Sequence, residues 1–234
     1  MLEHAGKNCE CIMGKLLVNI PVKDVQCDEI WGYVYKKEAH KFPFEANDKH
    51  RRRLLLCGNR AVFQLVLNFA LGRRDQATTD IFIEGLRGAT TNQRFQVTTD
   101  GFQPYKSSIE TTLGDRVDYA MLIKTYAEST DGERRYSPPE VVDAKPVVIL
   151  GNPDRDKICT SHIERQNLSI RMGMRRMTRL TNAFSKKWEN LWYAYCLWFA
   201  FYNFCRVHRT LRVTPAMEAG IADRVWDIRD LVAA

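Results

Sequence analysis

Three acidic side chains in this sequence are placed so that they could bind a divalent metal ion together. Asp100 follows an alternating run at residues 93–97 and precedes a glycine, and an Asp-Gly pair is typical of a turn at the end of a strand. Asp28 lies in a second strand-like run at residues 25–35, and Glu164 begins a helical pattern. Carboxylate oxygens are the ligands that hard divalent cations prefer. If the three acids converge, they form a carboxylate site for such cations.

Each acid taken alone has a simpler interpretation. A single carboxylate at the end of a strand or in the first turn of a helix is usually a solvated group or a cap. Glu29 directly follows Asp28. Because successive side chains of a strand point to opposite faces, we do not predict Glu29 as a ligand.

The composition is typical of a globular protein with one sizeable core and a small appendage. The chain has 234 residues, of which 45% are hydrophobic and 27% are charged. The formal net charge of +7 favours a polyanionic partner, although a basic balance alone leaves nucleic-acid binding open.

The cysteines and the N-terminus predict a cytoplasmic protein. The seven cysteines are odd in number and include no C-x-x-C pair, which favours reduced structural thiols over a zinc site or a disulfide framework. The first 25 residues lack the apolar core of a signal peptide. The aromatic run at 191–204 is too short to span a bilayer, which needs about 20 residues, so we expect a core helix there and no membrane partner.

The pattern along the chain alternates between strands and helices. We predict strands at 25–37, 63–69 and 93–97, and helices at 78–88 and 105–113. Residues 125–157 are rich in turn residues and have the character of an insertion, with a short strand at 147–150. From residue 161 onward the pattern is helical, and its longest segment spans 182–204. Thr78 or Thr79 is the predicted cap of the helix at 78–88.

Several motifs together resemble one known family. They are VQCDEIW at 25–31, TTDG at 98–101, YSPP at 136–139, GNPD at 151–154, TSHIERQNLSIR at 160–171, RRMTRLTNAFSKK at 175–187, YNFCRVHRTL at 202–211 and TPA at 214–216. The chain resembles bacterial insertion-sequence transposases of the IS-one type, which are DDE enzymes. The resemblance covers most of residues 8–42 and 65–234.

The resemblance implies a fold, a domain organisation and a chemistry. The fold is an α/β RNase H-like mixed sheet flanked by helices, with a helical C-terminal part. Residues 1–24 would be the remnant of an N-terminal DNA-binding region, residues 25–216 the catalytic domain, and residues 217–234 a helical tail. Asp28, Asp100 and Glu164 would be the catalytic and metal-binding residues. Two Mg²⁺ or Mn²⁺ ions would be bridged by Asp28 and would promote phosphoryl transfer.

The resemblance also implies a DNA-binding surface. Arg171 lies seven residues after Glu164, about two helical turns, so both share a face with Asn167. The candidates for contact with double-stranded DNA, on which the chain would form a homo-oligomer, are Arg165, Asn167, Arg171, Arg175, Arg176, Arg179, Lys186, Lys187, Arg206 and His208. For some of them a solvated face is the alternative, and for Arg206 and His208 a capping or helix-packing role. His162 lies two residues before Glu164, and for its side chain a structural hydrogen bond is the simpler interpretation than a place in the site.

Two departures from the family pattern weaken the prediction of activity. The chain begins within the last helix of the helix-turn-helix module that relatives carry. Residues 50–64 also do not match the expected second strand, Gly-Asp-Xaa-Tyr-Xaa-Phe-Val-Ala-Ile. Codons exist for residues 50–60 that, read one base later, give Ile-Gly-Asp-Ala-Tyr-Cys-Phe-Val-Ala-Ile-Glu. We therefore hypothesise a local frameshift that closes near Gln64, and residues 54–57 could still pair as a strand.

Three functions follow as hypotheses. The first is a transposase catalytic domain that cleaves DNA strands and transfers them with a divalent metal ion. The second is a truncated, locally frameshifted and inactive remnant that only binds DNA non-specifically. The third is an RNase H-like nuclease or resolvase without strand transfer. Metal-dependent nicking separates the second from the other two, and covalent joining of a 3′ end separates the first from the third.

Overall fold

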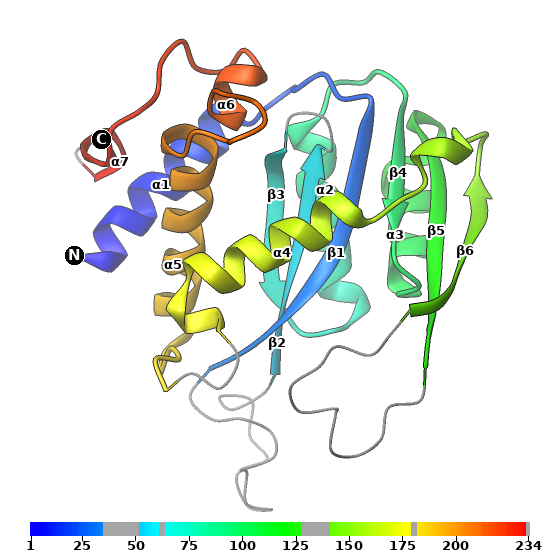
Figure 1. Ribbon diagram of the computed structural model, residues 1–234, viewed down its shortest axis with the longest axis horizontal. Coiled ribbons are helices and arrows are strands. Elements are labelled where there is room, and N and C mark those ends of the chain that lie inside the picture. Colours follow the sequence, from blue (N-terminus) through cyan, green and yellow to red (C-terminus); the bar gives the residue numbers. More distant parts are fainter. Residues whose placement is uncertain (35–51, 61–63, 128–140, 179–181, 233–234) are drawn as a thin grey trace, which may run out of the picture.

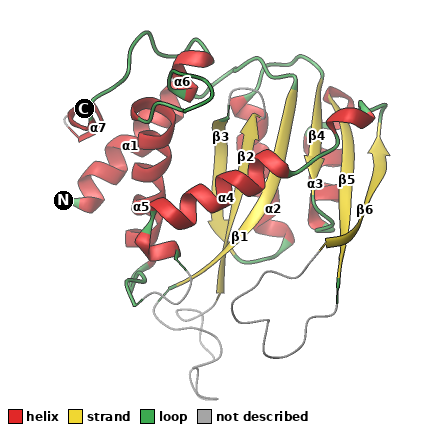
Figure 2. Ribbon diagram, viewed as in Figure 1, coloured by secondary structure: helices red, strands yellow, loops and turns green. Residues whose placement is uncertain are grey.

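A computed structural model describes residues 1–34, 52–60, 64–127, 141–178 and 182–232, and within it the side chains of Tyr33 and of residues 52–60 are not described. A six-stranded mixed sheet forms its centre, in the order β3-β2-β1-β4-β5-β6 (Figure 2). The strands are β1 (Asp24–Tyr33), β2 (Arg52–Arg60), β3 (Leu65–Gly72), β4 (Phe95–Thr99), β5 (Val117–Tyr126) and β6 (Val141–Leu150). This RNase H-like sheet, flanked by helices and followed by a helical C-terminal part, confirms the predicted fold class.

Helices cover both faces of the sheet and one of its edges (Figure 1). Helix α4 (Ser161–Gly173) lies across one face over β1, and α2 (Gln76–Ala89) and α3 (Pro104–Thr112) lie on the other. Helices α1 (Leu2–Leu16) and α5 (Trp188–Ala200) pack together beside β3. The short elements are η4 (Gly114–Arg116), η6 (Arg155–Lys157), η7 (Arg175–Met177), the π-helical η8 (Phe201–Cys205), α6 (Pro215–Glu218) and α7 (Ile228–Val232).

The strand pairing creates a switch point in the middle of the sheet. Strand β1 pairs antiparallel with β2, and β2 pairs antiparallel with β3. The chain then crosses through α2 to β4, which lies on the other side of β1 and parallel to it. In open α/β sheets, ligands bind near the carboxyl ends of strands at such a point. A ligand site is therefore expected at the carboxyl ends of β1 and β4.

Strand β2 completes the sheet in the segment where the sequence departs from the family pattern. Residues 52–60 pair with β1 from Val25↔Arg60 to Tyr33↔Arg52, and they also pair with β3. The register on β3 shifts between Gly58 and Asn59, which marks a bulge. The predicted pairing of residues 54–57 is thus confirmed for the backbone. The remaining residues of the 50–64 segment, apart from Gln64, lie outside the described residues.

The core forms where apolar faces of helices meet the sheet. In α2, Phe82, Ile83 and Leu86 recur at helical spacing and are fully buried. Every residue of β4 is buried, as expected for a central strand covered on both faces. The cap of α2 differs from the prediction, because Asp75 Oδ1 accepts a hydrogen bond from the backbone N–H of Thr78 at 2.9 Å. An aspartate satisfies the open N–H groups of a first turn as well as a threonine does.

The C-terminal helical layer is fixed to the sheet edge by one asparagine. Asn203 in η8 is fully buried, and its Oδ1 accepts a hydrogen bond from Val66 N at 3.1 Å. Its Nδ2 donates to Val66 O at 2.9 Å. The predicted helix at 182–204 thus begins later, at Trp188, and ends in a π-turn that points this amide at β3.

Strand β6 is longer than the sequence indicated. We predicted a short strand at 147–150 inside an insertion, but residues 141–150 pair with β5 over ten residues. The strand is largely exposed, so its side chains carry little of the hydrophobic alternation that reveals a strand in a sequence. Residues 128–140 of the predicted insertion lie outside the described residues.

Candidate functional site

The parallel pairing of β1 with β4 brings two of the predicted acids together. The pairing runs from Asp24↔Gln96 to Cys27↔Thr99, so Asp28 and Asp100 occupy the next position on each chain. Carboxylate oxygens of Asp28, Glu29 and Asp100 lie within 4.8 Å of one another. We call these three residues the acidic cluster.

Glu29 joins the cluster although it was not predicted as a ligand. Strand alternation does direct it away from α4, toward Arg74, whose Nη2 lies 3.6 Å from Glu29 Oε2. However, β4 ends at Thr99 while β1 continues, so Glu29 has a neighbouring strand only on the β2 side and none on the side of Asp100. The Glu29 side chain is only 5% exposed. Its Oε1 is buried and has no hydrogen-bond partner.

Asp100 is held by the turn that follows β4. Its Oδ1 accepts a hydrogen bond from the backbone N–H of Phe102 at 3.0 Å. Thr99 Oγ1 donates to the carbonyl of Asp100 at 2.9 Å and lies 3.0 Å from the Tyr119 hydroxyl. An aspartate that hydrogen-bonds its own backbone two residues ahead favours this kind of turn. The carboxylate is therefore fixed by local structure rather than by burial alone.

Two amide side chains tie helix α4 to β1. Gln26 Oε1 accepts hydrogen bonds from the backbone N–H groups of His162 at 3.0 Å and Ile163 at 3.2 Å, at the start of α4. One turn further along, Asn167 Nδ2 donates to Asp28 Oδ2 at 2.8 Å. Asn167, a predicted DNA contact, thus orients an acid of the cluster. His162 contributes only its backbone N–H to this contact, so the structural role expected of its side chain stays a prediction.

Glu164, the third predicted acid, lies apart from the cluster. Its Oε1 accepts a hydrogen bond from Thr160 Oγ1 at 2.6 Å and is paired with the ammonium group of Lys124 from β5. The Glu164 side chain is 47% exposed. Its negative charge nevertheless contributes to raising the pKa of both Asp28 and Asp100. The three predicted acids therefore interact electrostatically. Carboxylate oxygens of Asp28 and Asp100 lie within 4.8 Å of each other, whereas Glu164 is paired with Lys124.

The acids of the cluster resist ionisation. Burial, followed by the charge of Asp100, raises the pKa of Asp28 to about 7. Burial and then the charges of Asp100 and Asp28 raise the pKa of Glu29 to about 8. Burial also raises the pKa of Asp100, while the hydrogen bond from Phe102 opposes the rise. Carboxylates that repel one another in a partly dehydrated crevice favour a bound cation.

The donor set fits a hard divalent cation. It consists of carboxylate oxygens from two neighbouring strand positions and a turn, and these are the ligands that Mg²⁺ and Mn²⁺ prefer. Two buried oxygens beside Asp28 lack a hydrogen-bond partner, namely Glu29 Oε1 and Asn167 Oδ1. Buried polar atoms are nearly always paired, so unpaired oxygens at this place are compatible with ligands that await an ion or its water.

The predicted DNA contacts divide into tied and exposed residues. Arg171 Nη1 donates to Met177 O at 3.1 Å, and Arg176 Nη1 donates to Ser185 Oγ at 2.8 Å. Arg175, Lys186 and Lys187 are exposed. Arg179 lies outside the described residues.

A second basic group gathers near the first half of α4. The positive charges of Arg206 and Arg165, after burial, lower the pKa of His208. Arg206 lies over the ring of Tyr202 at 5.8 Å, and His208 Nδ1 is 3.0 Å from Thr210 Oγ1. These local contacts are compatible with the packing role as well as with DNA contact, so both alternatives for Arg206 and His208 stay predictions. The contacts also place positive charge next to the helix that carries Glu164.

Sequence reasoning missed four residues that shape the site. Glu29 and Tyr105 lie on the α3 side of β1, where the buried Tyr105 hydroxyl interacts with the Glu29 carboxyl and opposes the rise of its pKa. Arg74 stacks on Phe102, with 4.0 Å between its guanidinium carbon and the ring centre. Lys124 belongs to β5. The glutamate next to Asp28 was the one visible signal, and the alternation of strand side chains argued against it.

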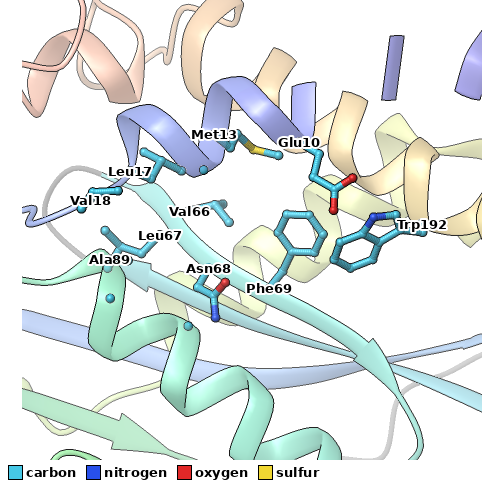
Figure 3. Close-up of a pocket in the computed structure, with 13 residues that line it drawn as sticks. Glu10, Met13, Leu17, Val18, Val66, Leu67, Asn68, Phe69, Ala89 and Trp192 are labelled. Carbon is cyan, nitrogen blue, oxygen red and sulfur yellow. The ribbon is translucent and has the colours of Figure 1, made fainter. Parts of the chain in front are cut away.

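A cavity between the helical layer and the sheet lies away from the acids. It has a volume of about 410 Å³ and is formed by α1, β3, α2 and α5 (Figure 3). Its wall is mostly apolar, and the ring of Phe69 lies beside that of Trp192, with 5.1 Å between the ring centres and Glu10 nearby. No acid of the cluster lines it. This cavity lies between packed layers and is separate from the acidic cluster.

Comparison with known proteins gives only distant structural similarity. No protein-family model matches the sequence, and no curated protein matches it. A piggyBac transposase, solved as a synaptic complex with hairpin DNA, is similar in structure with a TM-score of 0.41 and 9% sequence identity. The similarity covers 91% of this chain and 51% of that chain, so this chain spans about half the length of that transposase. A likeness of this degree assigns no role to individual residues.

None of the helices described in this structure has the length and hydropathy needed to span a lipid bilayer.

Proposed function

We propose that this chain is the catalytic domain of a DDE-type insertion-sequence transposase, which cleaves and joins DNA strands with divalent metal ions. The observation that carries the proposal is the meeting of Asp28 and Asp100 at the switch point of the sheet, with Glu164 on the helix that crosses it. The motifs around each of these acids support the same assignment.

The proposed chemistry assigns a task to each residue. Asp28 and Asp100 would hold Mg²⁺ or Mn²⁺ from the two strands, and Glu164 would contribute from α4. When bound, such ions would supply Lewis-acid stabilisation of the attacking and leaving oxygens of phosphoryl transfer. Asn167 fixes the orientation of the Asp28 carboxylate through its 2.8 Å hydrogen bond. The Phe102 N–H does the same for Asp100.

Positive charge around α4 supports DNA as the proposed partner. Arg165, Arg206 and His208 form one basic group, and Arg175 with Lys186 and Lys187 lies beyond the C-terminal end of the helix. Phosphate contacts of this kind position a duplex without reading its sequence. We expect double-stranded DNA to lie along α4 with a phosphate at the acids, and the chain to act there as a homo-oligomer.

The test uses the full chain and a labelled duplex of arbitrary sequence with a supercoiled plasmid as target. We expect plasmid nicking and covalent joining of the labelled 3′ end with Mn²⁺ but not with EDTA. Asp100→Asn should abolish both reactions and leave duplex binding unchanged. Nicking without joining would support the nuclease or resolvase alternative, and metal-independent nicking would contradict the proposal.

A second candidate is a remnant that binds DNA but has lost its chemistry. The pairing of Glu164 with Lys124 favours it, because a lysine ammonium takes the place of a cation beside the third acid. The hypothesis of a frameshift in residues 50–64 leads to the same candidate. DNA binding without any metal-dependent reaction would support this candidate. Codons for residues 50–60 that are incompatible with the shifted reading would rule out the frameshift.

A further inference from the structure

We propose that Glu29 is a ligand of the divalent cation, alongside Asp28 and Asp100. The inference deepens the proposed function and rests on it. It adds a residue that the pattern of three acids does not contain, and it changes how the first ion would be held.

The placement of Glu29 is the first argument. Its carboxylate lies with those of Asp28 and Asp100 within 4.8 Å, which a single ion can bridge, whereas Glu164 is not part of this group. Ligand distances to Mg²⁺ are about 2.1 Å, so two oxygens on one ion lie within about 4.2 Å of each other. Only a small adjustment is then needed for all three carboxylates to bind the same ion.

The unsatisfied state of Glu29 is the second argument. Only 5% of the side chain is exposed, yet Oε1 makes no hydrogen bond of ordinary geometry. The nearby buried hydroxyl of Tyr105 interacts with the Glu29 carboxyl without completing such a bond. Burying a carboxylate without full compensation is costly, and native proteins seldom do so without a function. A cation in the crevice would satisfy Oε1.

Arg74 supplies the charge balance of the metal-free protein. Its guanidinium lies 3.6 Å from Glu29 Oε2, a longer separation than that of a hydrogen-bonded ion pair. The Arg74 side chain is 42% exposed and rests on the ring of Phe102 at 4.0 Å. This arrangement leaves the other oxygen of Glu29 available. An alternative role for Glu29 is therefore only to hold Arg74 in place, and the experiment must separate the two roles.

The experiment measures binding of Mn²⁺ alone to the full chain, by the loss of the free-ion signal in electron paramagnetic resonance. We expect Glu29→Gln to weaken binding about 10–100-fold, the range typical of changes at a metal site. Glu29→Asp keeps the charge but withdraws the oxygens, so it should also weaken binding, by about 3–10-fold. Glu84→Gln, on the exposed face of α2, is the matched control and should bind as the unmodified chain does.

Arg74→Gln separates a ligand from an anchor. If Glu29 is a ligand, removing the competing positive charge should leave Mn²⁺ binding equal or a few-fold tighter. If Glu29 only anchors Arg74, then Glu29→Gln and Arg74→Gln should have similar small effects on binding. That result would overturn the inference, and so would wild-type affinity in Glu29→Asp, because charge alone would then suffice.

The outcome also distinguishes the inference from the proposed function. If the unmodified chain and Asp100→Asn bind Mn²⁺ equally weakly, the metal site itself is wrong and both proposals fail. If Asp100→Asn loses binding while both Glu29 variants retain it, only the role of Glu29 is wrong. Unfolding curves for each variant establish that the compared proteins are folded.

Discussion

The acids carried by the sheet and the acid carried by helix α4 have opposite surroundings. Burial raises the pKa of Asp28, Glu29 and Asp100, and repulsion by the other acids of the cluster adds to the rise at Asp28 and Glu29. Glu164 is half exposed, receives a hydrogen bond from Thr160 and is already matched by Lys124. The sheet thus gathers three carboxylates against one arginine, Arg74, and leaves negative charge unbalanced, whereas the helix offers a carboxylate whose charge is balanced by Lys124. We therefore predict that the strands contribute more to cation binding than α4 does.

The largest difference in Mn²⁺ affinity should appear between two single substitutions, one that removes an acid of the strands and one that removes the acid of α4. Asp28→Asn should weaken Mn²⁺ binding at least about 100-fold, because a central ligand is lost, while Glu164→Gln should weaken it less than about tenfold. Both should abolish nicking if the chain is a transposase. Titration with Mn²⁺ measures the contrast. Equal losses of affinity would remove the distinction between the two regions.

The pH dependence of stability should reveal the unbalanced charge. In the folded protein the pKa values of Asp28 and Glu29 are about 7 and 8, compared with ordinary values of 3.8 and 4.5. Between these limits the folded state binds more protons than the unfolded state, so the free energy of unfolding falls as pH rises. We expect a loss of about 1–3 kcal/mol between pH 5.5 and 8.5 in EDTA, measured by urea unfolding.

Two controls accompany the pH measurement. Glu29→Gln should flatten the dependence, because it removes one of the groups that takes up a proton on folding. Mn²⁺ at saturating concentration should restore stability at pH 8.5, since a ligand that binds only the folded state stabilises it. A dependence that persists unchanged in Glu29→Gln would contradict the assignment of this charge to the acidic cluster.

A smaller effect should follow from removing the cation of the balanced region. The positive charge of Lys124 lowers the pKa of both Asp28 and Asp100. The lysine ammonium and a metal ion would therefore compete for the negative charge of the same carboxylates. Lys124→Gln should therefore tighten Mn²⁺ binding by about 3–10-fold and lower the stability of the metal-free protein at pH 8. The exposed Lys106 provides a control substitution, Lys106→Gln, which should change neither quantity. Weaker binding in Lys124→Gln would show that the lysine supports the site instead.

The smallest effect concerns the outer part of α4. Arg171→Ala should weaken binding of duplex DNA a few-fold and reduce the salt slope by about one, if the guanidinium contacts a phosphate. Its Nη1 also donates to the carbonyl of Met177 in η7. If that hydrogen bond is its whole role, thermal stability should fall while the salt slope stays the same. Fluorescence anisotropy at several salt concentrations measures the slope.

The sequence predicted the part of the site that depends on local patterns. Period-two alternation located the strands that carry Asp28 and Asp100, and the Asp-Gly pair marked the turn. Alternation failed at Glu29, because it assumes neighbouring strands on both sides of β1, and on the side of Asp100 strand β4 ends at Thr99. A single-strand rule contains no information about where the next strand stops.

Contacts between distant segments could not be predicted in the same way. Lys124 and Glu164 are 40 residues apart, and their pairing depends on how α4 crosses the sheet. The bond from Asn167 to Asp28 joins residues 139 apart. Helical spacing placed Asn167 and Glu164 correctly on one face, but the role of the amide became visible only when β1 lay beneath it. The DNA contacts and the domain limits remain predictions.

The amide of Asn203 has a consequence for the two edges of the sheet. It presents to Val66 one donor and one acceptor, the same pair that a residue of an adjoining strand would offer. Strand β3, at one end of the strand order, is therefore blocked at that position by the chain's own side chain. At the other end lies β6, on which Val142 and Val148 are exposed. A second copy that extended the sheet would have to add beside β6. Self-association through strands would therefore give an edge-to-edge dimer in which both β6 edges are used and no further copy can add.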